Sequence, residues 1–263
     1  MLFDERGLPL RDDDNYAACA DQLVAMDYSG EFILFPRVDP AAVRRAALAG
    51  FMPMSVRVST GTGCMILFSP KLHLERCLID PAHVKPTRSA VRAADPYRVS
   101  LNTSFRSVLD QCVKAHGDGW LTTPLTDAFA SLAASSATGS VRLISVELYR
   151  NGGLVAGEFG YLVGSCYASL SGFTTESGAG TVQLYALAAI LAREGVQLWD
   201  LGMEMPYKLA LGARPVTRSE FLPRLREAYR HESPAFFLER RPAEDARPLL
   251  SKARVRVLGQ ATH

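Results

Sequence analysis

Two carboxylate side chains lie in segments that could deliver them to a reaction centre. Asp200 ends the apolar segment 198–200, and Glu158 lies inside the strand-like segment 154–163. Because the side chains of a strand alternate between its two faces, Glu158 shares a face with small and apolar residues, which favours a pocket. A carboxylate there could take up a proton or orient an amine. The alternatives are an aspartate that caps a strand end and a glutamate on a solvated face.

Other polar and aromatic residues lie on or beside the same segments. The hydroxyls of Ser169 and Ser171 could make hydrogen bonds, and Tyr207 and Lys208 follow soon after Asp200, so that Lys208 could meet a phosphate. Three aromatic residues could line an apolar pocket or stack on a nucleobase: Trp120, Phe159 and Phe173. Taken singly, most of these residues could equally well be ordinary core or surface residues.

Charge is distributed unevenly along the chain. Residues 1–40 contain nine Asp or Glu and three Lys or Arg, a net charge of −6, whereas residues 214–263 have a net charge of +5. An acidic leader on a basic body indicates an anionic partner. A phosphate-binding surface could combine two groups of cations: Lys85, Arg88 and Arg92 in one segment, and Arg214, Arg218, Arg224, Arg226 and Arg230 in another.

The composition is that of an ordinary globular protein. The 263 residues are 48% hydrophobic and 21% charged, which suits one large or two small domains. The five cysteines and five histidines are scattered, with no Cys-x-x-Cys pair, so we expect reduced thiols and no bound metal. No run approaches ~18 apolar residues, and the first residues lack a secretory signal pattern. We therefore expect a cytoplasmic protein with no membrane partner.

Short elements are expected in the first third of the chain. After a solvated acidic arm over residues 1–30, the pattern predicts a strand over 31–36, a helix from Asp39-Pro40 to Gly50, and strands over 54–58 and 64–68. Residues 80–96 are rich in proline and basic residues. They indicate a linker, with a domain boundary near residue 94.

The rest of the chain has longer periodic segments. We expect a strand over 97–101, a helix over 103–115 capped by Asn102, a helix over 123–134, strands over 141–150, 154–163 and 165–171, a helix over 182–193 and a strand over 196–203. Short turns make the three consecutive strands antiparallel, whereas a return through a helix makes a parallel pair. This order predicts an α+β fold whose mixed, mainly antiparallel sheet is flanked by helices.

Four collinear motifs are specific enough to indicate a family. They are Asp95-Pro96-Tyr97-Arg98-Val99-Ser100-Leu101-Asn102, Gly119-Trp120-Leu121-Thr122-Thr123, Gly152-Gly153-Leu154-Val155-Ala156-Gly157-Glu158-Phe159-Gly160, and Leu198-Trp199-Asp200 followed by Leu211-Gly212-Ala213-Arg214 and Arg218-Ser219-Glu220-Phe221. In this order the motifs resemble those of the leucyl/phenylalanyl-tRNA–protein transferases. Two family residues differ: Gly202 replaces a glutamine, and Leu170 replaces a glutamate.

The resemblance implies a GNAT-like acyltransferase domain joined to a small N-terminal α+β domain. It implies an aminoacyltransferase that moves leucine or phenylalanine from aminoacyl-tRNA to the N-terminal α-amino group of an acceptor protein or peptide, as in N-degron protein degradation. Neither a metal nor acetyl-CoA is required. We expect an acidic arm over 1–30, a small domain and linker over 31–94, a catalytic domain over 95–235, a basic tail over 236–263, and a monomer.

Residue chemistry, read together with the resemblance, gives expected roles for the residues singled out above; Glu158 stands where the family usually has an apolar residue. The expected catalytic residues are Asp200 and Glu158. The expected substrate-binding residues are Trp120, Phe159, Ser169, Ser171, Phe173, Gly202, Tyr207 and Lys208. The expected tRNA-binding residues are Lys85, Arg88, Arg214, Arg218, Arg224 and Arg226.

Two other functions stay open. Residues 175–180 contain a Gly-x-Gly before a helix, where a GNAT enzyme binds the pyrophosphate of acetyl-CoA, although the usual leading Arg or Gln is missing. The chain could therefore be an acetyl-CoA-dependent N-acetyltransferase. With two family residues replaced, it could also bind aminoacyl-tRNA or a protein N-terminus without catalysing transfer.

Overall fold

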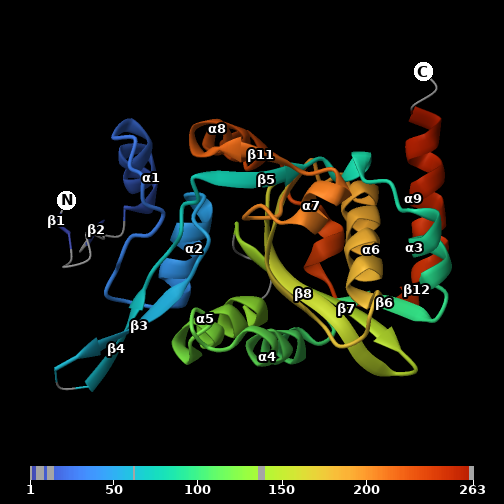
Figure 1. The fold of residues 1–263 in the computed structure, drawn as a ribbon, viewed down its shortest axis with the longest axis horizontal. Coiled ribbons are helices and arrows are strands. Elements are labelled where there is room, and N and C mark those ends of the chain that lie inside the picture. The colour runs from blue at the N-terminus through green and yellow to red at the C-terminus, as the bar shows by residue number, and fades with distance from the viewer. Residues whose placement is uncertain (1, 4–8, 11–14, 62, 136–139, 261–263) are drawn as a thin grey trace.

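A single eight-stranded sheet forms the centre of the molecule (Figure 1). The computed structural model describes residues 2–3, 9–10, 15–61, 63–135 and 140–260. The strands lie in the order β11-β5-β10-β9-β8-β7-β6-β12, and only the β9–β10 pair is parallel among the neighbours in this sheet. Their bounds are β5 Glu75–Ile79, β6 Tyr97–Leu101, β7 Arg142–Arg150, β8 Gly153–Val163, β9 Cys166–Thr174, β10 Leu198–Asp200, β11 Arg214–Thr217 and β12 Arg241–Asp245. The predicted α+β class with a mixed, mainly antiparallel sheet is confirmed.

Strands β7, β8 and β9 form the predicted antiparallel meander. The turn between β7 and β8 has positive φ at Asn151 (50°) and Gly152 (80°), which two-residue hairpin turns of type I′ require. Gly164 turns β8 into β9 with a φ of 56°, and a Cβ there would lie 2.3 Å from the carbonyl oxygen of Ala228. Both hairpins are thus fixed by local sequence, and the second also by its close contact with the chain at Ala228.

Helix α6, Ala179–Arg193, returns the chain from β9 to β10 as predicted, which makes these two strands parallel. The helix begins at Ala179 rather than at the predicted residue 182. Strand β10 ends at Asp200 rather than at the predicted residue 203, because the chain turns at Gly202 with a φ of 73°.

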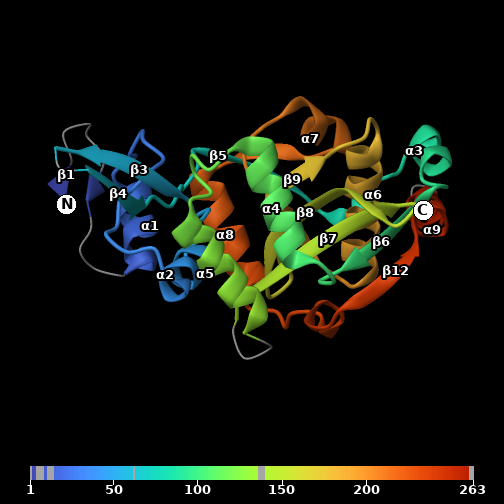
Figure 2. The same ribbon diagram turned by 90° about the horizontal axis from the view of Figure 1, so that it is seen from below.

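Helices cover both faces of the sheet (Figures 1 and 2). On one face lie α4, Phe105–His116, and α5, Thr123–Ala134, where the ring of Phe159 in β8 meets Phe105 and Phe129. On the other face lies α6, whose buried residues share a core cluster with Ala156 and Leu162 of β8. Helices α3, Arg88–Ala93, and α9, Ala246–Gln260, pack against α6.

The N-terminal part packs on the α4–α5 side of the sheet. It contains α1, Tyr16–Ala25, α2, Pro40–Leu48, the hairpin of β3, Ser55–Thr60, and β4, Gly63–Phe68, and a short pair of β1, Leu2–Phe3, and β2, Pro9–Leu10. The helix from Asp39-Pro40 and the β3–β4 hairpin are confirmed. The expectation of a solvated arm is wrong for residues 16–25, because Tyr16 and Leu23 of α1 are buried in the core.

Three further local predictions are corrected. Residues 31–36 form isolated bridges instead of a strand, since their partners are single residues such as Lys71 and Phe68. Asn102 does not cap α4, whose N-cap is Ser104; it has a φ of 57°, and its side chain contacts the backbone at Ser145. The segment 80–96 is not all loop, because it contains the 3-10 turn η1, Pro81–His83, and α3.

Three helical elements in the last part of the chain were not predicted from the sequence. They are α7, Pro206–Leu211, α8, Arg218–Ala228, and η2, Ala235–Leu238. Residues 75–79, for which we expected no strand and which fall in the predicted small domain and linker over 31–94, form β5, which is hydrogen-bonded to β10 and β11. Residues 236–263, expected as a tail, supply β12 and α9. The division into domains stays a prediction.

Helices of the described residues are all too short or too polar to cross a lipid bilayer.

Candidate active site at the end of strand β10

Strands β9 and β10 diverge near the middle of the sheet. Their register pairs Cys166, Tyr167 and Ala168 of β9 with Leu198, Trp199 and Asp200 of β10, and there β10 ends. Strand β9 continues to Thr174, paired on its other side with β8. Within the described chain, the last residues of β9 therefore face a gap in the sheet's hydrogen bonding, next to the turn that follows Asp200.

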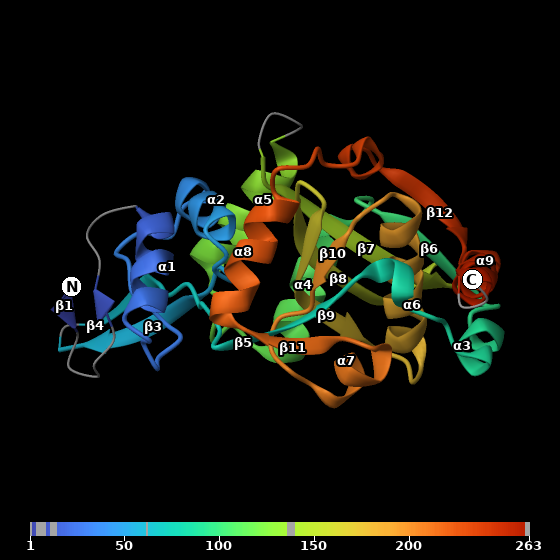
Figure 3. The same ribbon diagram turned by 90° about the horizontal axis from the view of Figure 1, so that it is seen from above.

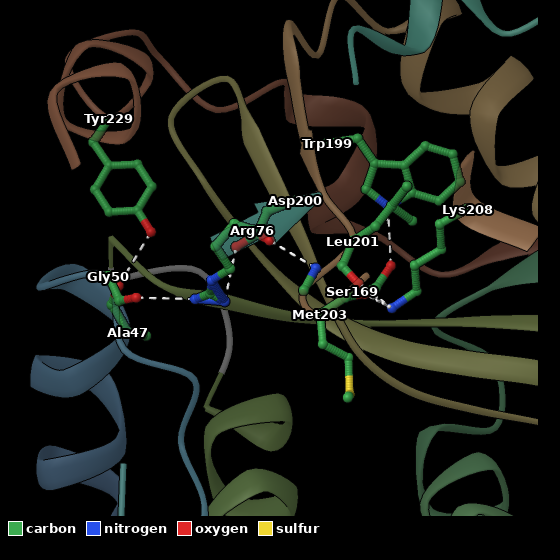
Figure 4. Close-up of polar contacts among 11 residues, drawn as sticks. Ala47, Gly50, Arg76, Ser169, Trp199, Asp200, Leu201, Met203, Lys208 and Tyr229 are labelled. Atoms are coloured by element: carbon green, nitrogen blue, oxygen red, sulfur yellow. Dashed lines mark hydrogen bonds and ion pairs between the residues drawn. The ribbon is translucent and has the colours of Figure 1, made fainter. Parts of the chain in front are cut away.

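The turn after β10 is held by backbone and side-chain hydrogen bonds (Figure 4). The Gly202 amide donates to Asp200 Oδ1 at 2.8 Å. The Cys77 amide in β5 donates to the Gly202 carbonyl at 2.7 Å, and the Leu201 amide donates to the Cys77 carbonyl at 2.9 Å. Because Gly202 has a positive φ, a residue without a Cβ suits this position.

Asp200 forms a buried ion pair with Arg76 of β5. The Arg76 Nη1 lies 3.3 Å from Asp200 Oδ2, and both side chains are 1% exposed. The guanidinium also donates from Nη2 to the Gly50 carbonyl at 3.0 Å and lies 4.7 Å from the ring centre of Phe221. In Figure 4, Arg76 lies between the N-terminal segment at Gly50 and the end of β10. Asp200 thus contacts the protein interior and not solvent.

Arg76 is a residue of this site that the sequence analysis missed. The only available signal was an arginine inside the otherwise apolar end of the segment Glu75–Ile79. A buried arginine is rare without a carboxylate partner, but the sequence did not show that Asp200 would be that partner.

Lys208 of α7 is buried and points into the same turn. Its Nζ donates to the carbonyl of Leu201 at 2.5 Å and to that of Met203 at 2.8 Å. Burial lowers the pKa of Lys208, and the nearby Cys77 and Asp200 oppose that shift. The predicted contact with a tRNA phosphate is not supported, because the ammonium contacts the two carbonyls that flank Gly202. Tyr207, by contrast, is 47% exposed.

Glu158 lies in a buried hydrogen-bond network under α6. Its carboxylate accepts from Ser169 Oγ at 2.7 Å, Tyr167 Oη at 3.1 Å and Gln183 Nε2 at 3.1 Å. The Trp199 Nε1 donates to the same Ser169 hydroxyl at 2.9 Å. Burial raises the pKa of Glu158, and the three donors partly offset that rise. The expected pocket-facing glutamate is therefore a buried residue whose hydrogen bonds reach β10 through Ser169.

The two carboxylates predicted to share one centre lie on opposite faces of the sheet. The side chain of Glu158 points to the α6 face of the sheet, where it meets Gln183, because its neighbour in the strand, Phe159, points to the α4–α5 core. Trp199 belongs to the α6 core, so its neighbour Asp200 points to the other side, where it meets Arg76. The structure does not bring Asp200 and Glu158 together as a catalytic pair.

The aromatic candidates are mostly core residues. Phe159 is fully buried between Phe105 and Phe129, and Phe173 is 6% exposed in the same cluster. Trp120 is only partly buried against that core. On the same face of β9, Ser171 bonds to the Cys112 thiol, whose pKa burial raises to about 12. Of the three aromatic residues, Trp120 is the one left with accessible surface for a ligand.

The predicted cations do not form one surface. Helix α8 lies toward α1 and α2, whereas α3, with Arg88, lies near α9 at the opposite end of the molecule (Figures 1 and 3). Arg218 is 6% exposed and donates to the carbonyls of Tyr28 and Gly30 at 2.9 Å and 2.7 Å, as well as to those of Leu72 and His73. Arg218 thus links the loop at residues 28–30 to the loop at residues 72–73 through hydrogen bonds to their backbone.

The remaining cations of this group are exposed. Arg214 and Arg224 lie on the surface, and Arg226 pairs with Asp21 of α1 at 2.5 Å. Lys85 is also exposed, in the segment before α3.

Two other polar features were not foreseen. Glu147 of β7 is fully buried and accepts hydrogen bonds from the hydroxyls of Ser100, Thr103 and Ser145 and from the Ser104 amide, which fixes the start of α4. A pocket of about 520 Å³ opens between α4, α5 and η2, and none of the predicted site residues lines it. Among the described residues, no group of three or more His, Cys, Asp or Glu side chains is arranged to hold a metal ion.

The fold and site define an α+β protein whose parallel strand pair diverges beside a tightly held turn. The sequence model of the leucyl/phenylalanyl-tRNA protein transferase family matches residues 78–226, and this chain belongs to that family. The matched region contains Glu158, Asp200 and Lys208; Arg76 lies just before it and α9 lies beyond it.

Individual relatives agree with this assignment. The chain is 31% identical over 158 residues to the leucyl/phenylalanyl-tRNA–protein transferase of Thiobacillus denitrificans, covering 58% of this chain and 67% of the relative. It is 33% identical over 133 residues to that of Xanthomonas oryzae pv. oryzae, covering 49% and 51%. The matches thus span about half to two thirds of the length of these relatives. Among solved structures, the C-terminal domain assigned to a lysylphosphatidylglycerol synthetase of Agrobacterium fabrum covers 98% of this chain and 87% of its own, with 14% identity and a TM-score of 0.38.

Proposed function

We propose that this protein transfers leucine or phenylalanine from aminoacyl-tRNA to the N-terminal α-amino group of an acceptor protein or peptide. The observation that carries the proposal is the family match over residues 78–226, which contains strands β6 to β11 and the turn after β10. We also propose that it acts as a monomer in the cytoplasm, where charged tRNA meets nascent or cleaved proteins.

The geometry suits a reaction that needs positioning more than strong acid–base catalysis. An aminoacyl ester is already activated, so the protein must mainly align a neutral amine with the ester carbonyl and stabilise the oxyanion. We propose a GNAT-like arrangement, in which the two substrates meet where β9 and β10 diverge beyond Ala168 and Asp200. Polar groups at the open end of β9 and in the turn would orient them.

The buried residues near this position have supporting roles in the proposal. Asp200, Arg76 and Lys208 hold the turn at Gly202, and Glu158 acts through Ser169 on Trp199. We retain Trp120 and Tyr207 as candidates for contact with the aminoacyl side chain or the terminal adenine, since both have accessible surface. Arg214, Arg224 and Arg226 remain candidates for tRNA contact, whereas Arg218 does not.

An acetyl-CoA-dependent reaction is less well supported. The segment before α6 contains Glu176, whose carboxylate accepts hydrogen bonds from Arg150 at 3.1 Å and Tyr97 at 3.3 Å. A carboxylate at this position places negative charge near the helix N-terminus that would have to receive a pyrophosphate. We therefore do not propose acetyl-CoA as a substrate.

The experiment is to incubate the purified protein with radiolabelled leucyl- or phenylalanyl-tRNA and a peptide that begins with arginine. Label in the peptide is the expected result, and coenzyme A in excess should not reduce it. The Asp200→Asn variant should transfer less, with Glu232→Gln, an exposed change of the same type far along the chain from the turn, as the control. Saturable binding of aminoacyl-tRNA without transfer to any peptide would instead support a binding protein, and no binding or transfer would contradict the proposal.

A further inference from the structure

The pocket of about 520 Å³ lies where the start of α4 meets α5 and η2 (Figure 2). Asn102, just before α4, holds one wall in place, because its Nδ2 donates to the carbonyls of Phe237 and Glu239 at 3.1 Å and 3.2 Å. At the other end of α4, His116 Nε2 donates to the Gly172 carbonyl in β9 at 2.7 Å. A helix of 12 residues is about 18 Å long. The pocket and the open end of β9 are therefore separate sites at opposite ends of α4.

Arginines from separate elements surround this pocket. They are Arg44 of α2, Arg106 of α4, Arg142 of β7 and Arg240 of the segment before β12. Arg106 is already paired, with Asp110 at 3.0 Å and with Asp127 at 3.6 Å. Within the described part of the chain, no carboxylate pairs with Arg44 or Arg240. These two guanidinium groups therefore keep an uncompensated positive charge.

Carboxylates near the pocket do not neutralise these two arginines. Among the described residues that line it, Glu239 is the only acidic one, and it pairs with Arg241 at 3.2 Å. Glu147 lies beneath the start of α4, but it is 0% exposed and accepts hydrogen bonds from groups inside the protein. The pocket therefore has an excess of positive charge, which attracts an anion.

Arg44 also has a polar atom for which the protein supplies no partner. Its Nε is buried and makes no hydrogen bond within the described chain. Buried polar groups are nearly always hydrogen-bonded, so an unpaired one marks a position where a bound group completes the bonding. The first turn of α4 adds to this, because its N-cap Ser104 makes no side-chain cap bond and residues 104–107 line the pocket. The amides of a helix's first turn favour a negative charge.

We propose that this pocket binds a small organic phosphomonoester, with its phosphate group on Arg44 and Arg240. A phosphomonoester carries a charge of about −1.5 to −2 at neutral pH, which matches two uncompensated guanidinium groups. The planar fork of arginine binds phosphate oxygens in pairs. The inference goes beyond the proposed transfer reaction and does not depend on it, because the pocket lies away from the turn after β10.

The size and lining of the pocket indicate that the ligand has an organic part. A volume of about 520 Å³ far exceeds that of a phosphate ion and lies in the range of small-molecule sites. Phe105, Leu132 and Leu238 supply apolar surface beside the arginines. Such surface has no use for an inorganic anion, but it can bury an aromatic or aliphatic group.

A small anion fits this pocket better than an RNA strand. The side chains of Asp110, Asp127 and Glu239 are each more than half exposed around it. An extended chain of phosphates that passed over the pocket would meet these carboxylates and be repelled by them. A ligand with a single phosphate group can contact Arg44 and Arg240 and avoid them.

The test measures binding of 4-methylumbelliferyl phosphate, an aromatic phosphomonoester, by equilibrium dialysis. Arg44→Gln and Arg240→Gln should each weaken binding about tenfold, because each removes a charged donor to the phosphate. Arg37→Gln removes an exposed arginine that does not line the pocket and should leave the affinity within about twofold. Arg240 is exposed, so its variant should keep the fold even if Arg44→Gln does not, and thermal unfolding curves check both.

Competing ligands separate this pocket from the proposed transfer site. Inorganic phosphate and 4-methylumbelliferone each lack half of the probe and should bind at least about tenfold more weakly. The leucyl ester of adenosine, in excess, should not displace the probe. Displacement by that ester, equal affinity for 4-methylumbelliferone, or unchanged affinity in both arginine variants would overturn the proposal. If no transfer from aminoacyl-tRNA is found but probe binding depends on both arginines, the proposed function fails and the pocket stands.

Discussion

At the scale of single residues, the two carboxylates of the candidate site serve different local structures. Asp200 is tied to Arg76 and to the Gly202 amide, and Glu158 to three donors beneath α6. Each is nearly inaccessible to solvent, so each can act on a substrate only through the groups that it holds. Their predicted importance therefore becomes a matter of positioning, which stability and pH measurements can examine.

Asp200→Asn should destabilise the fold strongly. The change leaves the Arg76 guanidinium buried without its charged partner, and loss of one member of a buried ion pair costs about 3–5 kcal/mol. Urea unfolding measures the difference in the free energy of unfolding. The double variant Arg76→Met/Asp200→Leu removes both charges and should recover much of the loss; a stable Asp200→Asn single variant would contradict the importance of the pair.

Glu158→Gln should change how stability depends on pH. The pKa of Glu158 is higher in the folded protein than in the unfolded chain, because burial disfavours the charged form. Between the two values the folded state binds more protons, so this residue's contribution to stability is greatest at low pH and is lost as the pH rises through the folded pKa. The difference in Tm between the variant and wild type should thus shift in favour of the variant as the pH rises above about 4.5.

At the scale of elements, the turn after β10 depends on neighbours that are distant in sequence. Cys77 and Arg76 of β5 hold it from one side, and Lys208 of α7 holds it from the other. Within the turn itself the Gly202 amide donates to Asp200 Oδ1, and β10 before it has only three residues. The diverging strands β9 and β10 are therefore fixed in place by β5 and α7.

Gly202→Ala should loosen this turn. At a φ of 73° a Cβ is unfavourable by about 1–2 kcal/mol, and the new methyl would lie 3.2 Å from Met52 Cε. Hydrogen exchange at the amides of residues 201–203 should accelerate, and transfer should decrease. Gly119→Ala is the matched control, because a Cβ at Gly119 meets no atom within 4 Å. Equal exchange in both variants would show that the turn tolerates the side chain.

At the scale of the whole molecule, two buried arginines join the N-terminal part to the sheet. Arg76 reaches the carbonyl of Gly50 behind α2, and Arg218 at the start of α8 reaches the loops at Tyr28 and Leu72. The burial of His73 and the cations around it hold the pKa of that histidine far below its usual value, so it stays neutral among them. The basic character of residues 214–230 is thus partly structural.

Arg218→Ala should lower stability and leave tRNA affinity unchanged. The change removes donors from several buried carbonyls, each of which costs about 1–3 kcal/mol when left without a partner. Thermal unfolding and tRNA binding, measured together, decide the matter. Arg224→Ala removes an exposed arginine on the same helix and should show little change in Tm. Weaker tRNA binding by Arg218→Ala at an unchanged Tm would restore its predicted phosphate contact.

The sequence by itself determined the elements whose signals are local. The Asn151-Gly152 turn, the proline starts of α2 and α5 and the apolar period of α6 need no distant partner, and the structure contains each of them. The collinear motifs likewise identified the family, because residue order is a property of the sequence alone.

Only the tertiary structure decided which residues meet. The side chain of Asn102 accepts a hydrogen bond from the Ser145 amide and does not cap α4. Strand β5 belongs to the main sheet through its hydrogen bonds to β10 and β11. Which face Asp200 occupies depends on how β10 lies between β5 and β9, so its pairing with Arg76 and its separation from Glu158 could not be read from spacing. The physical reason is that burial and ion pairing depend on contacts between segments far apart in sequence, whereas turns and caps depend on neighbouring residues.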